Sequence, residues 1–126
     1  KQRCVVPADG YYEWRKNNEG KKVPYFIKRE HNEILFFSGL YQKNTNLEFS
    51  LITTEAKGNI SEIHHRMPVV LRENEIKNYL CSEDPITFLN SHQNPALEFY
   101  EIGRDVNNPS NNHVGLLDPA LKKPRY

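Results

Sequence analysis

The sequence predicts an α+β domain built mainly on antiparallel β-sheet. Three observations support this fold class: strand-favouring runs separated by turn signals come first, short helical patterns are interleaved later, and no regular strand-helix-strand alternation occurs. The chain has 126 residues, of which 37% are apolar and 11% aromatic, enough for one domain with a real core. A purely parallel sheet is disfavoured.

The first half of the chain predicts a series of hairpins. Val5 and Val6 form a short strand that Pro7 ends, and the turn at residues 8–10 leads into an aromatic strand. Polar turns separate the runs that follow. Strands are predicted in this half at residues 11–14, 24–27, 34–40 and 49–53.

A short helix is predicted before the middle of the chain. Asn59 and Glu62 have the spacing of a capping box, with Asn59 as the N-cap, so the helix should run to about Ile63. His64 would then lie just where this helix ends.

The second half predicts two further helices and two further strands. A helix over 73–80 would place Ile76, Tyr79 and Leu80 on one face. Asp84 followed by Pro85 is an N-cap with proline at the first helical position. The two strands are predicted at residues 68–71 and 97–102, and the helix that follows Asp84 at 86–90. Irregular structure is predicted from residue 107, with a solvated tail at 118–126.

Composition restricts the function classes. A formal net charge of +1 gives no global field typical of a nucleic-acid binder, so DNA contacts would come from local cations, with Lys43 and Lys57 as candidates by charge alone. The only two cysteines lack a CxxC spacing, which indicates a reducing cytosol. No apolar run approaches the roughly 20 residues that span a bilayer, so no membrane partner is expected.

Two stretches, RCVVPADGYYEW at 3–14 and SEIHHRMPVVL at 61–71, place proton-moving groups on rigid apolar segments. Glu13 either points to solvent from its strand, or is partly desolvated by the sheet wall and serves as a proton donor and acceptor. His64 either closes a helix end or acts in catalysis. Zinc binding by His64 and His65 is disfavoured, because adjacent extended residues point apart and no further ligand accompanies them.

These two stretches resemble the SRAP family (SOS response-associated peptidase domain), whose members attach covalently to abasic sites in single-stranded DNA. The resemblance covers almost the whole chain, including the closing segment EIGRDVNNP, and implies one domain over 1–126 with a partial-barrel sheet. By the YEW and IHHRMP motifs, it implies that Glu13 and His64 are the catalytic residues, with His65 at a variable position.

The resemblance also implies a DNA-binding set. Arg66 would contact the backbone, Trp14 would stack on a base beside the lesion, and Thr53 and Thr54 match a segment near the DNA. The implied partner is single-stranded DNA with abasic sites, bound by a monomer without cofactor or metal. The implied location is the bacterial cytoplasm, near the nucleoid when bound to DNA.

In one respect the chain departs from the family pattern. Family members react through a cysteine that becomes the N-terminal residue when the initiator methionine is removed by autoproteolysis. This cysteine then forms a thiazolidine with the abasic site. The present sequence opens at Lys1 instead. The domain is therefore expected to lack its N-terminal segment, and the chain as given to form no adduct. Cys4 and Cys81 have no context of a nucleophile. Two other functions compete: a non-covalent single-stranded DNA-binding module, and a cysteine peptidase that acts on other proteins.

Overall fold

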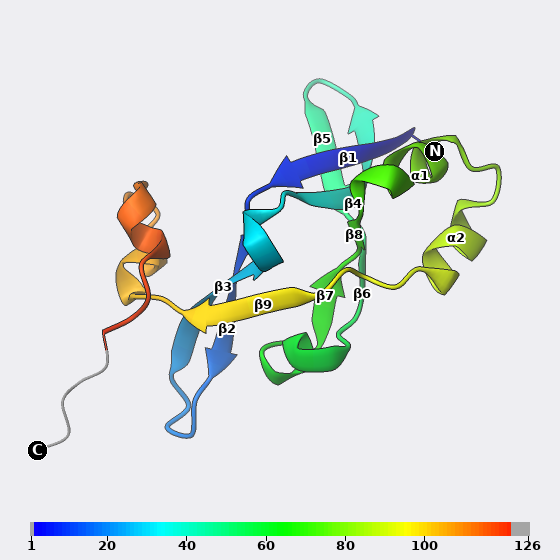
Figure 1. Cartoon of the computed structure of the whole chain (residues 1–126). Coiled ribbons are helices and arrows are strands. Elements are labelled where there is room, and N and C mark those ends of the chain that lie inside the picture. The colour runs from blue at the N-terminus through cyan, green and yellow to red at the C-terminus, as the bar shows by residue number, and fades with distance from the viewer. Residues whose placement is uncertain (1, 122–126) are drawn as a thin grey trace, which may run out of the picture.

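The computed structural model describes residues 2–121. Three antiparallel sheets and two short α-helices make up the fold, which confirms the predicted α+β class. The sheets do not close into a barrel within the described residues. Helices α1 and α2 lie at one end of the molecule, and the C-terminal turns, drawn in orange and red, lie at the other (Figure 1).

The first sheet is organised around a long central strand. β4 (Leu35–Lys43) pairs over residues 35–41 with the whole length of β1 (Gln2–Ala8). On its other side, it pairs with β8 (Val70–Leu71) and then with β5 (Leu47–Leu51). The prediction that Pro7 ends the strand is wrong, because β1 continues through Pro7 to Ala8. An edge strand tolerates proline, since no second strand needs the N–H that proline lacks.

The second sheet carries the first of the two motif stretches. Its order is β2 (Tyr11–Lys16), β3 (Lys22–Arg29) and β9 (Leu97–Glu101), so β2 is an edge strand. A separate two-stranded ribbon pairs β6 (Thr53–Glu55) with β7 (Arg66–Pro68). The predicted strand at 49–53 is therefore divided between two sheets.

Residues 2–121 contain seven short helical segments, of which five connect strands and two, the most C-terminal, follow the last strand. Two are α-helices, α1 (Ile76–Cys81) and α2 (Pro85–Ser91). Five are 3-10 turns: η1 (Glu30–Asn32), η2 (Gly58–Glu62), η3 (Glu73–Glu75), η4 (Arg104–Asn107) and η5 (Val114–Leu117). None of the helices within 2–121 has the length and apolar character needed to cross a bilayer.

The capping-box prediction at Asn59 is wrong, although a helical turn does form there. Lys57 is the N-cap residue of η2 and makes no side-chain cap. The Asn59 side chain instead donates from Nδ2 to the carbonyl oxygen of Leu97 at 2.9 Å. A tertiary bond to β9 therefore replaces the local cap and ties η2 to the second sheet.

The predicted helix at 73–80 begins as η3 and continues as α1. Tyr79 is fully buried, and its hydroxyl donates to the carbonyl oxygen of Gly39 at 2.6 Å. Leu80, expected on the same buried face, is 39% exposed, because this short helix packs through little more than one side chain. The N-cap prediction at Asp84 is confirmed: hydrogen bonds from the Thr87 hydroxyl and backbone N–H hold the pKa of Asp84 below its usual value.

The hydrophobic core joins the sheets and fixes the position of η2. Ile60 and Ile63 are buried among core residues from β3, β4 and β9, so the segment that leads to His64 is anchored by apolar packing. The buried residues of this cluster are Ile27, Leu35, Phe37, Ile60, Ile63, Met67, Val70 and Leu97.

The C-terminal segment folds back on the second sheet. Pro119 forms an isolated bridge with Ile102, and the backbone N–H of Ala120 donates to the carbonyl oxygen of Glu101 at 2.9 Å. The remainder of the tail predicted at 118–126 lies, from residue 122, outside the described residues.

Candidate functional site

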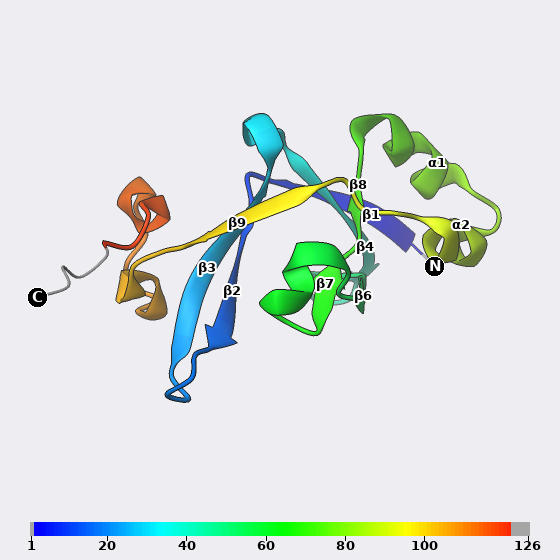
Figure 2. The same ribbon diagram turned by 60° about the horizontal axis from the view of Figure 1, so that its bottom comes forward.

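Glu13 and His64 line the same open groove, of about 1100 Å³, although 51 positions separate them in the sequence. The groove lies between the edge strand β2 and the η2 turn, which both views of the ribbon place side by side (Figures 1 and 2). Its walls are completed by Trp14, Lys16, Lys22, Ser61, Ile63, His65, Val106, Asn107 and Pro109.

Glu13 is half-buried on the wall of this groove rather than fully solvated. Its Oε1 accepts the backbone N–H of Trp14 at 3.3 Å. Tyr11 lies two residues earlier, on the same face of β2. Burial, and to a smaller extent the nearby Glu13 carboxylate, raise the pKa of the Tyr11 hydroxyl far above its ordinary value. That hydroxyl is buried and has no hydrogen-bond partner within the described residues. The Glu13 carboxylate therefore lies between the open groove and the buried hydroxyl of Tyr11.

His64 lies directly after η2, as predicted, and its backbone N–H donates to the carbonyl oxygen of Ile60 at 3.1 Å. The ring atom Nδ1 is 3.1 Å from the amide nitrogen of Arg66 and 3.2 Å from its carbonyl oxygen. Since one nitrogen takes only one of these roles, the tautomer decides which bond forms. In either case, bonds within 2–121 engage Nδ1 and leave Nε2 for a ligand.

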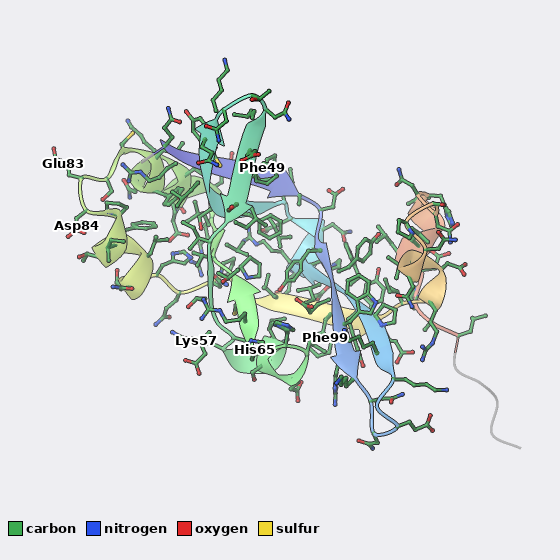
Figure 3. The ribbon with its side chains drawn as sticks, turned by 180° about the vertical axis from the view of Figure 1, so that it is seen from behind. Phe49, Lys57, His65, Glu83, Asp84 and Phe99 are labelled. Atoms are coloured by element: carbon green, nitrogen blue, oxygen red, sulfur yellow. The ribbon has the colours of Figure 1, made fainter. Side chains whose placement is uncertain are left out.

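His65 does not point away from His64. The two rings are stacked, with centroids 4.4 Å apart and planes 27° from parallel, and both line the groove. Figure 3 shows His65 beside the η2 turn. The expectation of opposite sides is wrong because these residues follow a 3-10 turn rather than lie within a regular strand. Residues 2–121 contain no group of three His, Cys, Asp or Glu side chains arranged to hold a metal.

Arg66 and Thr53 are brought together by the β6–β7 ribbon. One guanidinium nitrogen of Arg66 donates to the Thr53 carbonyl oxygen at 2.9 Å and to its hydroxyl at 3.1 Å. Thr54 faces the other way, opposite the buried Met67, and lines a separate cavity of about 390 Å³ that also includes Lys57. The two threonines therefore lie on opposite faces of one strand.

Trp14 and Glu13 leave opposite faces of β2, yet both line the groove because β2 is an edge strand and the groove continues around its edge. The indole Nε1 of Trp14 donates to Oδ1 of Asn107 at 2.7 Å. This bond, from the turn η4, fixes the orientation of a half-buried aromatic ring at the groove wall.

Neither cysteine lies in the groove. Cys4 is on β1, where burial raises the pKa of its thiol. Its Sγ is 3.0 Å from the position that a Cβ on Gly39 would occupy, so the thiol fills the space left by that glycine. Cys81 is exposed at the end of α1.

The sequence interpretation missed the contribution of Lys16, Lys22 and Asn107 to the groove. A signal for the lysines was present in the segment RKNNEGKK at 15–22, where four cations accompany one carboxylate. No sequence signal connects Asn107 with Trp14, which it meets across 93 positions.

Comparison with known proteins agrees with the motif resemblance. The family model for SOS response associated peptidase (SRAP) matches residues 1–109. The chain is 35% identical over 128 residues to the abasic site processing protein YoaM of Bacillus subtilis, covering 93% of this chain and 56% of YoaM. It is 29% identical over 147 residues to the abasic site processing protein HMCES of Gallus gallus, covering 94% of this chain and 44% of HMCES.

The fold is also similar to solved structures. A crystal structure of a protein from Bacteroides thetaiotaomicron superposes with a TM-score of 0.77 and 30% sequence identity, covering 96% of this chain and 58% of that one. The chain thus spans about half the length of the relatives that it matches.

Proposed function

This chain belongs to the SOS response associated peptidase (SRAP) family, and from that membership we propose that it supplies the acid–base groups of a protein that crosslinks to abasic sites in single-stranded DNA. The observation that carries the proposal is the shared groove: Glu13 and His64, distant in sequence, line one open cavity. Relatives named abasic site processing proteins support the substrate class.

The nucleophile in this proposal is a cysteine upstream of Lys1, made N-terminal by removal of the initiator methionine. Its amine attacks the aldehyde carbon of the ring-opened abasic sugar, and the carbinolamine loses water to give an imine. The thiol sulfur then bonds to the imine carbon, while the imine nitrogen takes up the thiol proton. Aldehyde and cysteine thus give a thiazolidine and one water, with no oxidant or reductant.

Each groove residue has a defined role in this reaction. Glu13 takes a proton from the attacking amine and returns it to the departing hydroxyl, which suits a half-buried carboxylate held by the Trp14 amide. His64 uses Nε2, the ring nitrogen not engaged by Arg66, as a hydrogen-bond partner of the sugar oxygen during ring opening. The same two groups assist removal of the initiator methionine.

The DNA contacts in this proposal lie next to these groups. The Arg66 guanidinium, which is held by hydrogen bonds to Thr53, contacts a backbone phosphate. Trp14 stacks on a base beside the lesion. Thr54 belongs to the neighbouring cavity and would contact the DNA there. The protein acts as a monomer in the cytoplasm, in keeping with two free cysteines within the described residues.

Trp14→Ala should weaken binding of single-stranded DNA by about 5- to 150-fold, because one base–aromatic stack is worth roughly 1 to 3 kcal/mol. Fluorescence anisotropy with a labelled oligonucleotide measures the change. Phe49→Ala is the matched control, since Phe49 is an aromatic residue on β5, 59% exposed and outside the groove (Figure 3). Equal affinities for the two variants would remove Trp14 from the interface.

Intact-mass spectrometry tests the proposed function. Full-length protein mixed with an oligonucleotide that carries one abasic site should give a species with the two masses combined less one water. Replacing the N-terminal cysteine with alanine should abolish that species, and the 126-residue chain should not form it. A covalent complex of the 126-residue chain would refute the assigned nucleophile, and DNA binding without added mass would leave a non-covalent binding module.

A cysteine peptidase that acts on other proteins finds less support. If Cys4 or Cys81 were its nucleophile, that thiol would have to lie beside His64, whereas both cysteines lie outside the groove that His64 lines.

A further inference from the structure

The β2–β3 hairpin concentrates positive charge beside the groove. Residues 15–22 contain Arg15, Lys16, Lys21, Lys22 and one carboxylate, a formal charge of +3, while the whole chain carries only +1. The hairpin projects from the rest of the fold (Figure 1). The remaining residues are therefore net acidic, and the hairpin is a local positive feature on a nearly neutral protein.

Two of these lysines are placed against each other. Lys16 and Lys22 are cross-strand partners at the end of the β2–β3 pairing. Like charges directly opposite in a sheet are destabilising. Among residues 2–121, neither ammonium group has an ion-pair partner, although Lys28 on the same sheet pairs with Glu98 at 2.6 Å. The facing pair of Lys16 and Lys22 therefore lowers the stability of the free protein. An anion bound between the two ammonium groups would explain why both lysines are present.

The two lysines share a surface with Trp14. Side chains on a strand alternate, so Lys16 lies on the Trp14 face of β2, and Lys22 joins it from β3. All three line the groove that holds Glu13 and His64. Alternate residues on one strand are about 6.6 to 6.8 Å apart, so Lys16 and Trp14 are neighbouring positions on this face of β2. A basic groove that carries an aromatic platform is the usual way to bind a single strand.

We infer that Lys16 and Lys22 form a phosphate-binding site that grips the DNA backbone beside the base stacked on Trp14. This inference rests on the proposed function and extends it, because it gives the strand a path from the abasic sugar at Glu13 and His64 around the edge of β2 to the hairpin. The ligand chemistry is a phosphodiester, recognised by charge and not by sequence.

The salt dependence of binding tests this site. Each phosphate contact on a single strand contributes about −0.7 to the slope of log Kobs against log salt concentration. The Lys16→Gln/Lys22→Gln double variant should therefore reduce the magnitude of the slope by about 1.4. The protein is the full-length form with its N-terminal cysteine replaced by alanine, and the oligonucleotide has no abasic site, so binding is measured without chemistry.

Lys43→Gln/Lys77→Gln is the matched control, because it removes two exposed lysines, at the end of β4 and on α1, that line neither the groove nor the Thr54 cavity. A slope change confined to the Lys16/Lys22 variant supports the site. Equal changes in both double variants would overturn it, as general charge would then explain them. The phosphate site would also be refuted if the Lys16/Lys22 variant kept the wild-type slope and self-associated in light scattering. The two lysines would then serve only to keep the edge strand β2 from pairing with another chain.

The adduct assay keeps this result separate from the proposed function. Full-length protein that forms the thiazolidine while the slope is unchanged refutes the lysine site alone. A reduced slope in a protein that forms no adduct supports the lysine site and refutes the covalent function.

Discussion

Glu13→Gln in the full-length protein should slow formation of the covalent adduct by about 100- to 10,000-fold, the range that a positioned acid–base group contributes. Glutamine keeps the shape of the side chain but cannot take up or return a proton. Adduct is measured as the SDS-stable complex formed over time on abasic single-stranded DNA. Glu62→Gln is the control, because Glu62 is exposed on η2 and does not line the groove.

His64→Ala should slow the same reaction within a similar range, because it removes the Nε2 atom that we propose as the hydrogen-bond partner of the sugar oxygen. Non-covalent DNA affinity should change much less than the rate in both variants, and thermal unfolding should stay two-state. His113→Ala serves as the exposed histidine control. Rates equal to wild type in Glu13→Gln and His64→Ala would remove both side chains from the mechanism.

Leu35→Ala should lower the free energy of unfolding by about 2 to 5 kcal/mol, as expected for a cavity left in a packed core. Leu35 is fully buried at the start of β4 and belongs to the cluster that also holds Ile60 and Ile63 beneath the η2 turn. Its neighbour Ile34 is 48% exposed, so Ile34→Ala provides a control one position away.

Urea denaturation measures both variants by their midpoints at constant slope. Ile34→Ala should fall within about 0.5 kcal/mol of wild type, the usual range for surface substitutions. Similar losses in the two variants would contradict the burial pattern of β4 and, with it, the anchoring of His64 to the core.

Local chemistry in the sequence was enough for most of the fold. Aromatic and β-branched runs between turn residues predicted the strands of the two larger sheets, and Asp84 followed by Pro85 predicted the start of α2. These signals succeed because turn formation and N-capping depend on neighbours along the chain. The PADG and IHHRMP segments likewise identified the family, which the family model then matched over residues 1–109.

Predictions failed where a distant partner competed with the local pattern. Asn59 has capping-box spacing, yet its side chain bonds to Leu97 on β9. Leu80 belongs to a helical apolar face, yet only Tyr79 finds a buried site against the first sheet. Pro7 remains in β1 because that strand has no neighbour on its outer side.

The sequence by itself determined the residue types of the candidate site: a carboxylate within a strand, an imidazole after a helical turn, and a cluster of cations in one hairpin. Only the tertiary structure decided that the carboxylate, the imidazole and two of the hairpin lysines line one groove. It also decided that Thr53 and Thr54 lie on opposite faces and that Asn107 orients Trp14. The physical reason is that strand register and the docking of η2 depend on contacts between distant segments, and a shift of one residue would turn each side chain to the other face.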